Sequence, residues 1–179
     1  MNNGFLMFPF DDIIEKLKGF RKMRTMLLSF NPYWYEKIKS GEKVFEYRTN
    51  FPDDIVKAYM YVSSPYKKAI GIIYLGRRIA LTDWKEKYQN DVEVSARIER
   101  YIERRNYAMP ILSYHHTEAV ELAELRDQFP NFVSPQMYYF LDNRKELLYF
   151  LENKMCEKYK IEHKFDDISK NEICRENYN

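Results

Sequence analysis

The chain has 179 residues, and its 29 basic and 27 acidic side chains leave a formal net charge of +2. This near balance excludes binding of long nucleic acid through overall positive charge, although it allows a local basic patch. The length favours one domain with additions. Two isolated cysteines, Cys156 and Cys174, and the lack of a signal-peptide pattern or an apolar run long enough to span a membrane predict a cytoplasmic protein with free thiols.

The chain is expected to divide into three parts: an N-terminal extension (1–25), a main domain (26–141) and a C-terminal part (142–179). In the extension, Ile13, Ile14, Leu17 and Phe20 recur at helical spacing. We expect a helix here that docks on the main domain; the alternative is an arm that contacts a partner or nucleic acid.

The first half of the main domain alternates strands with a short helix. Gly41 is expected to end the helix in a left-handed conformation, and Gly71 and Gly76 to mark bulges or bends that curve a sheet. The segments predicted as strands are 26–30, 43–49, 55–63 and 69–81, and the predicted helix spans 33–39.

The second half is richer in helices. A helical insertion is predicted at about 82–105, capped at Thr82 or Asp83 and with a break near Asn90-Asp91. The last helix is expected to follow a cap at Asp142, and the tail after Lys160 is polar and expected to fray. The remaining predictions are strands at 111–116 and 136–141 and helices at 120–129 and 143–159. Together they predict an α+β fold: a small curved β-barrel with flanking helices, a helical insertion and a C-terminal helix.

One predicted strand carries charges of both signs. Side chains alternate along a strand, so Phe45 and Tyr47 share one face, while Val44, Glu46 and Arg48 share the other. Lys43, just after the glycine turn, can swing toward Glu46. The charges form either a solvent-facing ion pair of little energetic value or a site that brackets a polar ligand.

The pattern G-x-K-x-x-E-x-R, formed by Gly41, Lys43, Glu46 and Arg48, resembles the signature of the ASCH domain, a PUA-like β-barrel. Ser63-Ser64-Pro65 before a strand with an early glycine, and Val133 to Tyr138 as a closing strand, are also similar to this family. The resemblance implies a cleft beside the barrel that receives RNA or a modified nucleoside. Basic residues near aromatics suit single-stranded RNA. The predicted binding residues are Lys43, Glu46, Arg48, Ser63, Ser64, Lys67, Lys68 and Gln136.

Two alternative functions remain open. Some small relatives of the ASCH domain are amidohydrolases acting on acetylated pyrimidine nucleosides, and their motif has a threonine three residues after the lysine, where this chain has Glu46. A carboxylate does not replace a hydroxyl nucleophile, so an enzyme acting on nucleosides or RNA would use Lys43 and Glu46 in acid/base roles. The other alternative is a protein-interaction adaptor that binds a partner through the added helices, near Glu93–Arg105 or at the N-terminus.

No metal site or cofactor is predicted. His115, His116 and Glu118 are close in sequence, but adjacent histidines on a strand point to opposite faces. The sequence contains no zinc-ligand spacing, no glycine-rich phosphate loop and no nucleophile elbow.

Overall fold

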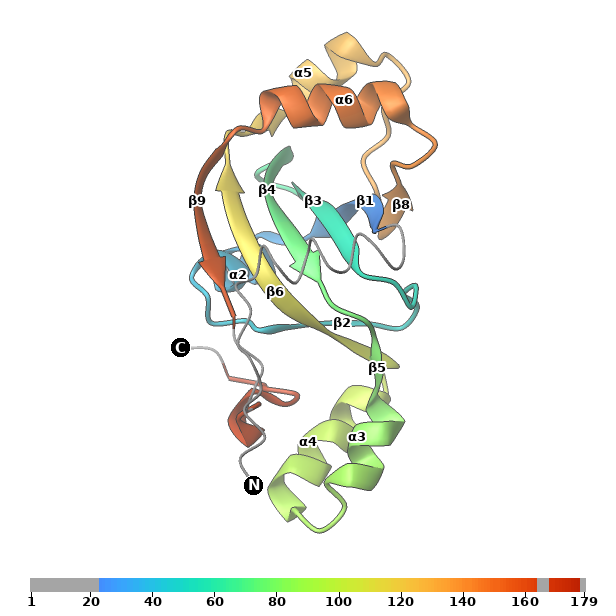
Figure 1. Ribbon diagram of the computed structural model, residues 1–179, viewed down its shortest axis with the longest axis vertical. Helices are drawn as coiled ribbons and strands as arrows, with labels where there is room; N and C mark the ends of the chain where they lie inside the picture. Colours follow the sequence, from blue (N-terminus) through green and yellow to red (C-terminus); the bar gives the residue numbers. More distant parts are fainter. Residues whose placement is uncertain (1–22, 164–167, 178–179) are drawn as a thin grey trace, which may run out of the picture.

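The computed structural model describes residues 23–163 and 168–177 (Figure 1). The helix predicted within residues 1–25 lies outside the described residues. Strand β1 starts at Arg24, two residues before the predicted start at Met26.

A curled mixed sheet forms the centre of the fold, with strands in the order β2-β6-β4-β3-β1-β8. Strand β1 pairs with β3 in parallel, and the other pairings are antiparallel. Short strands β5 and β9 add to β6, and β7 adds to β4. The architecture is α+β with a curled half-barrel of strands, in agreement with the predicted small curved sheet and flanking helices. The strands are β1 (Arg24–Phe30), β2 (Phe45–Arg48), β3 (Val56–Val62), β4 (Lys68–Leu75), β5 (Ile79–Ala80), β6 (Tyr107–Thr117), β7 (Val120–Glu121), β8 (Tyr138–Phe140) and β9 (Glu157–Glu162).

The helices gather at the ends and one side of the sheet. Figure 1 shows α5 and α6 together at one end, and α3 with α4 at the other. Helix α2 begins after Asn31, whose side chain accepts a hydrogen bond from the Trp34 amide at 2.9 Å. The helices are α2 (Pro32–Lys39), α3 (Leu81–Lys87), α4 (Val92–Ile102), α5 (Leu122–Gln128) and α6 (Lys145–Lys154), followed by a short 3-10 helix, Lys170–Glu172.

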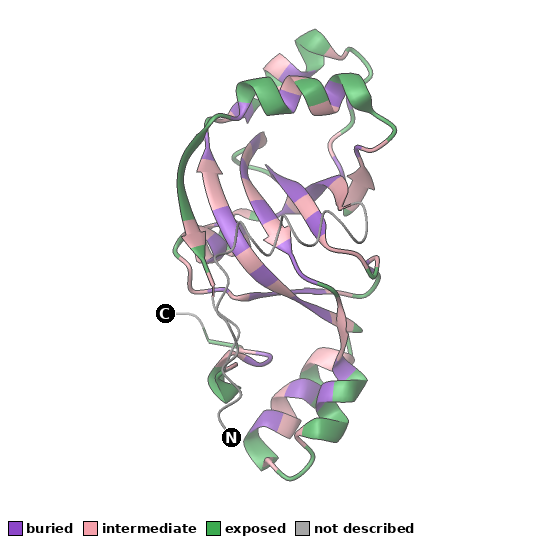
Figure 2. Ribbon diagram, in the orientation of Figure 1, coloured by how far each residue is buried: buried purple, intermediate pink, exposed green. Residues whose placement is uncertain are grey.

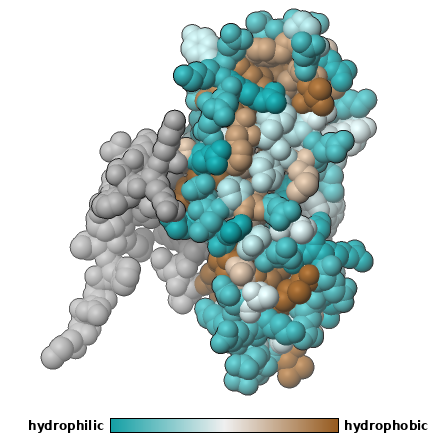
Figure 3. Space-filling view, turned by 90° about the vertical axis from the view of Figure 1, so that its right-hand side faces the viewer, coloured by the Kyte–Doolittle hydropathy of each residue, from teal (hydrophilic) through white to brown (hydrophobic). Residues whose placement is uncertain are grey.

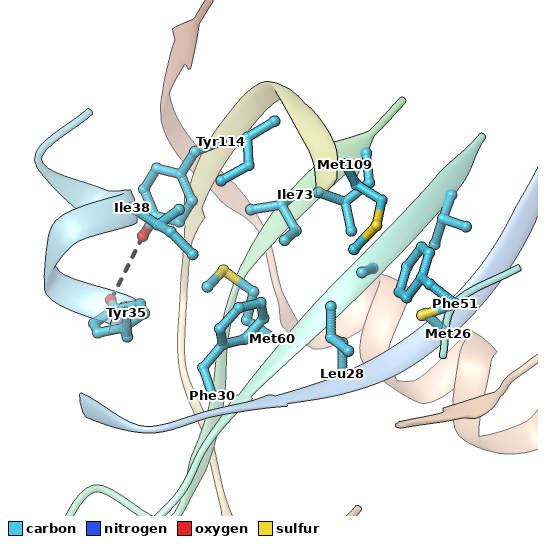
Figure 4. Close-up of a cluster of buried hydrophobic side chains, with 14 of the residues drawn as sticks. Met26, Leu28, Phe30, Tyr35, Ile38, Phe51, Met60, Ile73, Met109 and Tyr114 are labelled. Carbon is cyan, nitrogen blue, oxygen red and sulfur yellow. Dashed lines mark hydrogen bonds between the residues drawn. The ribbon is translucent and has the colours of Figure 1, made fainter. Parts of the chain in front are cut away.

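The core lies inside the curl of the sheet (Figure 2). Buried residues alternate with more exposed ones along β4, whereas β3 is buried at every position except Lys57. Figure 4 shows Tyr35 and Ile38 of α2 close to Tyr114 of β6, with Met60 and Ile73 of the central strands beside them. Two further clusters join α5 and α6 to one end of the sheet and α3 and α4 to the other. The single curved sheet is therefore packed on several sides.

Gly71 of β4 lies where the register between β3 and β4 shifts, between the pairs Tyr59–Ile72 and Tyr61–Ala69. Its φ is +81°, and a Cβ atom there would lie 2.6 Å from the Tyr114 ring. Glycine is therefore required both by the backbone conformation and by the close approach of the ring. This confirms the predicted bulge. The predicted strand 69–81 is in fact divided, since β4 ends at Leu75 and β5 covers only Ile79–Ala80.

The insertion consists of two helices, with the break at the predicted position. Asp91 caps α4 and accepts a hydrogen bond from the Val94 amide at 3.2 Å. The predicted cap of α3 is wrong: the N-cap is Ala80, which has no side chain able to cap.

Figure 3 shows a mostly hydrophilic face with apolar patches toward both ends of the molecule.

The C-terminal part differs most from prediction. The last helix ends at Lys154 rather than at Tyr159, and Glu157–Glu162 forms strand β9 on the edge of β6. Asp142 does not cap α6; it pairs with Arg24 at 3.0 Å. The tail beyond Lys160 also contributes to the core, because Ile173 and Cys174 are fully buried.

No helix in the described part of the chain has the length and apolar character needed to cross a membrane.

Candidate ligand-binding cleft

Strand β2 separates its side chains between two environments. Phe45 and Tyr47 pack into the cluster around α3 and α4, and Glu46 and Arg48 lie on the opposite face, as alternation predicts. Val44, expected beside Glu46, packs instead against the Phe45 cluster, because the strand begins only at Phe45. The charges are not solvent-facing: the side chains of Lys43 and Glu46 are only 5% and 7% exposed.

The turn that precedes β2 delivers Lys43 to this face. Gly41 has φ +79°, and the Lys43 amide donates to the Lys37 carbonyl at 2.9 Å. Lys43 Nζ donates to the Phe45 carbonyl at 2.5 Å and lies 3.3 Å from Glu46 Oε2. Burial lowers the pKa of Lys43, and the Glu46 carboxylate opposes this effect only in part.

Aromatic rings surround the same ammonium group. Lys43 Nζ lies 4.9 Å from the centre of the Trp34 ring and 5.1 Å from that of Tyr47. Such cation–π contacts stabilise a desolvated cation. Lys43 is thus held in one position by a carbonyl, a carboxylate and two rings.

Arg48 retains hydrogen-bonding capacity. Its Nε lies 2.7 Å from Glu46 Oε1, so the two charges are in contact, but the N–H is not directed at that oxygen and Nε has no hydrogen bond within the described chain. Nη2 donates to the Ser29 carbonyl at 2.9 Å, and the guanidinium carbon lies 5.3 Å from the centre of the Phe30 ring. A buried donor without a partner costs free energy, which a ligand acceptor can recover.

These charges lie at a cleft of about 1080 Å³. Its volume is that of a large small-molecule site, and it accommodates an aromatic ring system. Four aromatic residues from separate elements contribute to its lining, namely Phe30, Trp34, Tyr47 and Tyr101.

The cleft contains five of the eight predicted binding residues: Lys43, Glu46, Arg48, Ser63 and Gln136. Ser64, Lys67 and Lys68 do not line it. The chain turns away after Ser63, with the Lys67 amide closing the turn on the Ser63 carbonyl at 3.2 Å. Lys68 starts β4 and its Nζ lies 3.6 Å from Glu121.

One wall of the cleft comes from segments that the sequence analysis left outside the site. The end of α4 and the residues after it contribute Arg100, Tyr101 and Glu103–Arg105, and the tail contributes Glu176. The cluster of arginines was visible in the sequence, but the segment near Glu93–Arg105 was considered only as a surface for a protein partner. The insertion therefore borders the cleft, and the exposed side chains of Glu103–Arg105 lie at its rim.

His115 and His116 lie on β6 and do not line this cleft. His115 contacts Ser113 and Glu157, whereas His116 contacts Tyr114 and stacks on Tyr159, so the adjacent rings occupy opposite faces as predicted. Among residues 23–163 and 168–177, no three His, Cys, Asp or Glu side chains are grouped so that they can hold a metal ion.

Solved ASCH structures from Zymomonas mobilis share this fold. The ASCH protein superposes with a TM-score of 0.54 at 22% identity, over 72% of this chain and 95% of that chain. Its serine-to-alanine variant gives the same score and identity, and a tyrosine-to-phenylalanine variant gives 0.52 at 21% identity. No protein-family model and no curated protein sequence matches. The chain has the fold of an ASCH domain, as its motifs predict.

Proposed function

We propose that this chain is a cytoplasmic ASCH-fold module that binds RNA or a modified nucleoside in the cleft at β2. The observation that carries the proposal is the buried pair Lys43–Glu46, together with the partly buried Arg48, at the wall of an aromatic-lined cleft. Buried ion pairs contribute little to stability compared with apolar packing. Their position beside a cavity therefore favours a role in recognition.

The available groups match the chemistry of a base. Glu46 accepts hydrogen bonds from a base edge, and Arg48 Nε and Lys43 donate to carbonyl or phosphate oxygens. Trp34 and Tyr101, both partly exposed in the lining, offer stacking surfaces for an unpaired base. Ser63 and Gln136 add polar groups from neighbouring strand ends.

The test is binding of short single-stranded RNAs and a panel of modified nucleosides, comparing wild type with Lys43→Met and Arg48→Met. Arg24→Met is the matched control, since Arg24 also pairs with a carboxylate and lies over a ring, that of Phe140, but does not line the cleft. Circular dichroism checks the fold of each variant. We expect affinity to fall at least about tenfold in both cleft variants and to stay unchanged in the control. Wild type that binds no probe, or equal binding by all variants, would refute the proposal.

A second candidate function is catalysis on the same ligands. It is favoured by the lowered pKa of Lys43, because a buried amine that loses its proton more readily can act as a base. Mass spectrometry of each binding mixture tests it. A product formed by wild type and Arg24→Met but not by Lys43→Met would establish the reaction.

A further inference from the structure

Three arginines line the cleft from the end of α4 and the residues just after it. They are Arg100, Arg104 and Arg105. Their backbone is fixed to the charged strand. The Asn106 amide donates to the Arg48 carbonyl at 3.1 Å, and Asn106 Nδ2 donates to the Thr49 carbonyl at 3.0 Å. Thr49 Oγ1 donates to the Arg104 carbonyl at 3.0 Å. The insertion thus presents its arginines directly beside Arg48.

Two of these arginines have no acidic partner within the described part of the chain. The guanidinium groups of Arg104 and Arg105 form no ion pair with a carboxylate among residues 23–163 and 168–177, and both side chains are exposed. The positive charge of Arg105 also contributes to lowering the pKa of Lys43, which places the two groups in one electrostatic environment. This wall carries three arginines and two carboxylates, Glu103 and Glu176, so its net charge is positive.

The third arginine already holds an anionic group. Arg100 Nε and Nη2 donate to the two oxygens of Glu176 at 2.5 and 2.9 Å, and Glu176 lines the same cleft. The tail is held against α4 by the Tyr101 hydroxyl, which donates to the Arg175 carbonyl at 2.6 Å. Carboxylates and phosphates both accept bidentate hydrogen bonds from an arginine guanidinium. Glu176 therefore occupies a position that suits two oxygens of a phosphate.

We propose that Arg100, Arg104 and Arg105 form a phosphate subsite, so that the ligand of the cleft is a phosphorylated nucleotide or an RNA segment rather than a free nucleoside. The base lies toward Trp34 and Glu46, and the phosphate lies toward the end of α4. Glu176 competes with the phosphate for Arg100. This inference rests on the proposed function, since it assigns the ligand class of the same cleft.

The test compares each ribonucleoside with its 5′- and 3′-monophosphates and with a four-nucleotide RNA, by calorimetry at about 50 and about 200 mM NaCl. We expect wild type to bind the best phosphorylated probe at least about tenfold more tightly than its nucleoside. Arg104→Gln combined with Arg105→Gln should reduce affinity for the phosphorylated probe more than affinity for the nucleoside, so that the advantage is lost, and should reduce the salt dependence. Glu176→Gln should increase affinity for the phosphorylated probe alone, by several fold.

The control combines Arg126→Gln on α5 with Lys145→Gln on α6, both exposed and outside the cleft lining, which removes the same net charge. Equal losses in the control and in the double arginine variant would overturn the subsite, because the effect would then reflect net charge. Nucleoside binding that depends on Lys43 and Arg48 but gains nothing from a phosphate would overturn this inference and leave the proposed function intact. No binding of any probe would refute both.

Discussion

Replacing Glu46 with glutamine tests whether this carboxylate compensates the buried ammonium group of Lys43. Glu46 lies 3.3 Å from Lys43 Nζ and 2.7 Å from Arg48 Nε, and its side chain is nearly inaccessible to solvent. Removing one partner of a buried ion pair costs about 3–5 kcal/mol of unfolding free energy. The glutamine oxygen still accepts a hydrogen bond, so we expect about 3 kcal/mol, which lowers Tm by about 6–12 °C in a chain of this size.

The loss should depend on pH. Burial lowers the pKa of Lys43 in the folded chain, so the unfolded chain binds this proton more tightly, and stability rises with pH between the folded and unfolded pKa. Without Glu46 the folded pKa falls further, and this rise begins at a lower pH. The stability deficit of the variant should therefore shrink as the pH increases toward the ordinary range of lysine.

The measurement is urea unfolding followed by tryptophan fluorescence, at about pH 7 and about pH 9.5. Glu99→Gln is the control, because the Lys85–Glu99 pair has a similar distance, 3.1 Å, with both side chains more than half exposed. Its effect should stay below about 1 kcal/mol. A Glu46→Gln deficit that is absent, or identical at the two pH values, would show that the carboxylate does not compensate a buried ammonium.

Two further predictions concern the packing of the fold. Gly71→Ala should destabilise the chain by at least about 2 kcal/mol more than Gly41→Ala in urea unfolding, because both residues have positive φ but only the Cβ at Gly71 would meet the Tyr114 ring; equal losses would contradict this packing. Burial raises the pKa of the Cys174 thiol to about 12, whereas Cys156 is exposed. A thiol reagent at about pH 8 should therefore label one cysteine in the native chain and two after unfolding, and rapid native labelling of both would contradict the burial of the tail.

The sequence alone predicted the features that depend on local pattern. The alternation of apolar and charged residues in β2 fixed which side chains share a face, and Gly41 marked the turn that brings Lys43 to that face. The spacing of motifs along the chain was sufficient to predict the ASCH fold. The core face of α6 was also predictable, because Leu147 and Leu151 recur at helical spacing.

The features that sequence missed depend on contacts between distant segments. Strand β9 was predicted as helix and tail because its residues are mostly charged, and only the free edge of β6 gives its backbone hydrogen-bond partners. The arginines after α4 lie in a segment that was considered from the sequence only as a surface for a protein partner.

Only the tertiary structure brings these arginines to the cleft, because the exit of the insertion is hydrogen-bonded to Arg48 and Thr49. The sequence thus determined the charged strand and the fold around it. Long-range hydrogen bonds decided which residues lie opposite that strand across the cleft. Such bonds join segments more than fifty residues apart and leave no periodic signal in the chain.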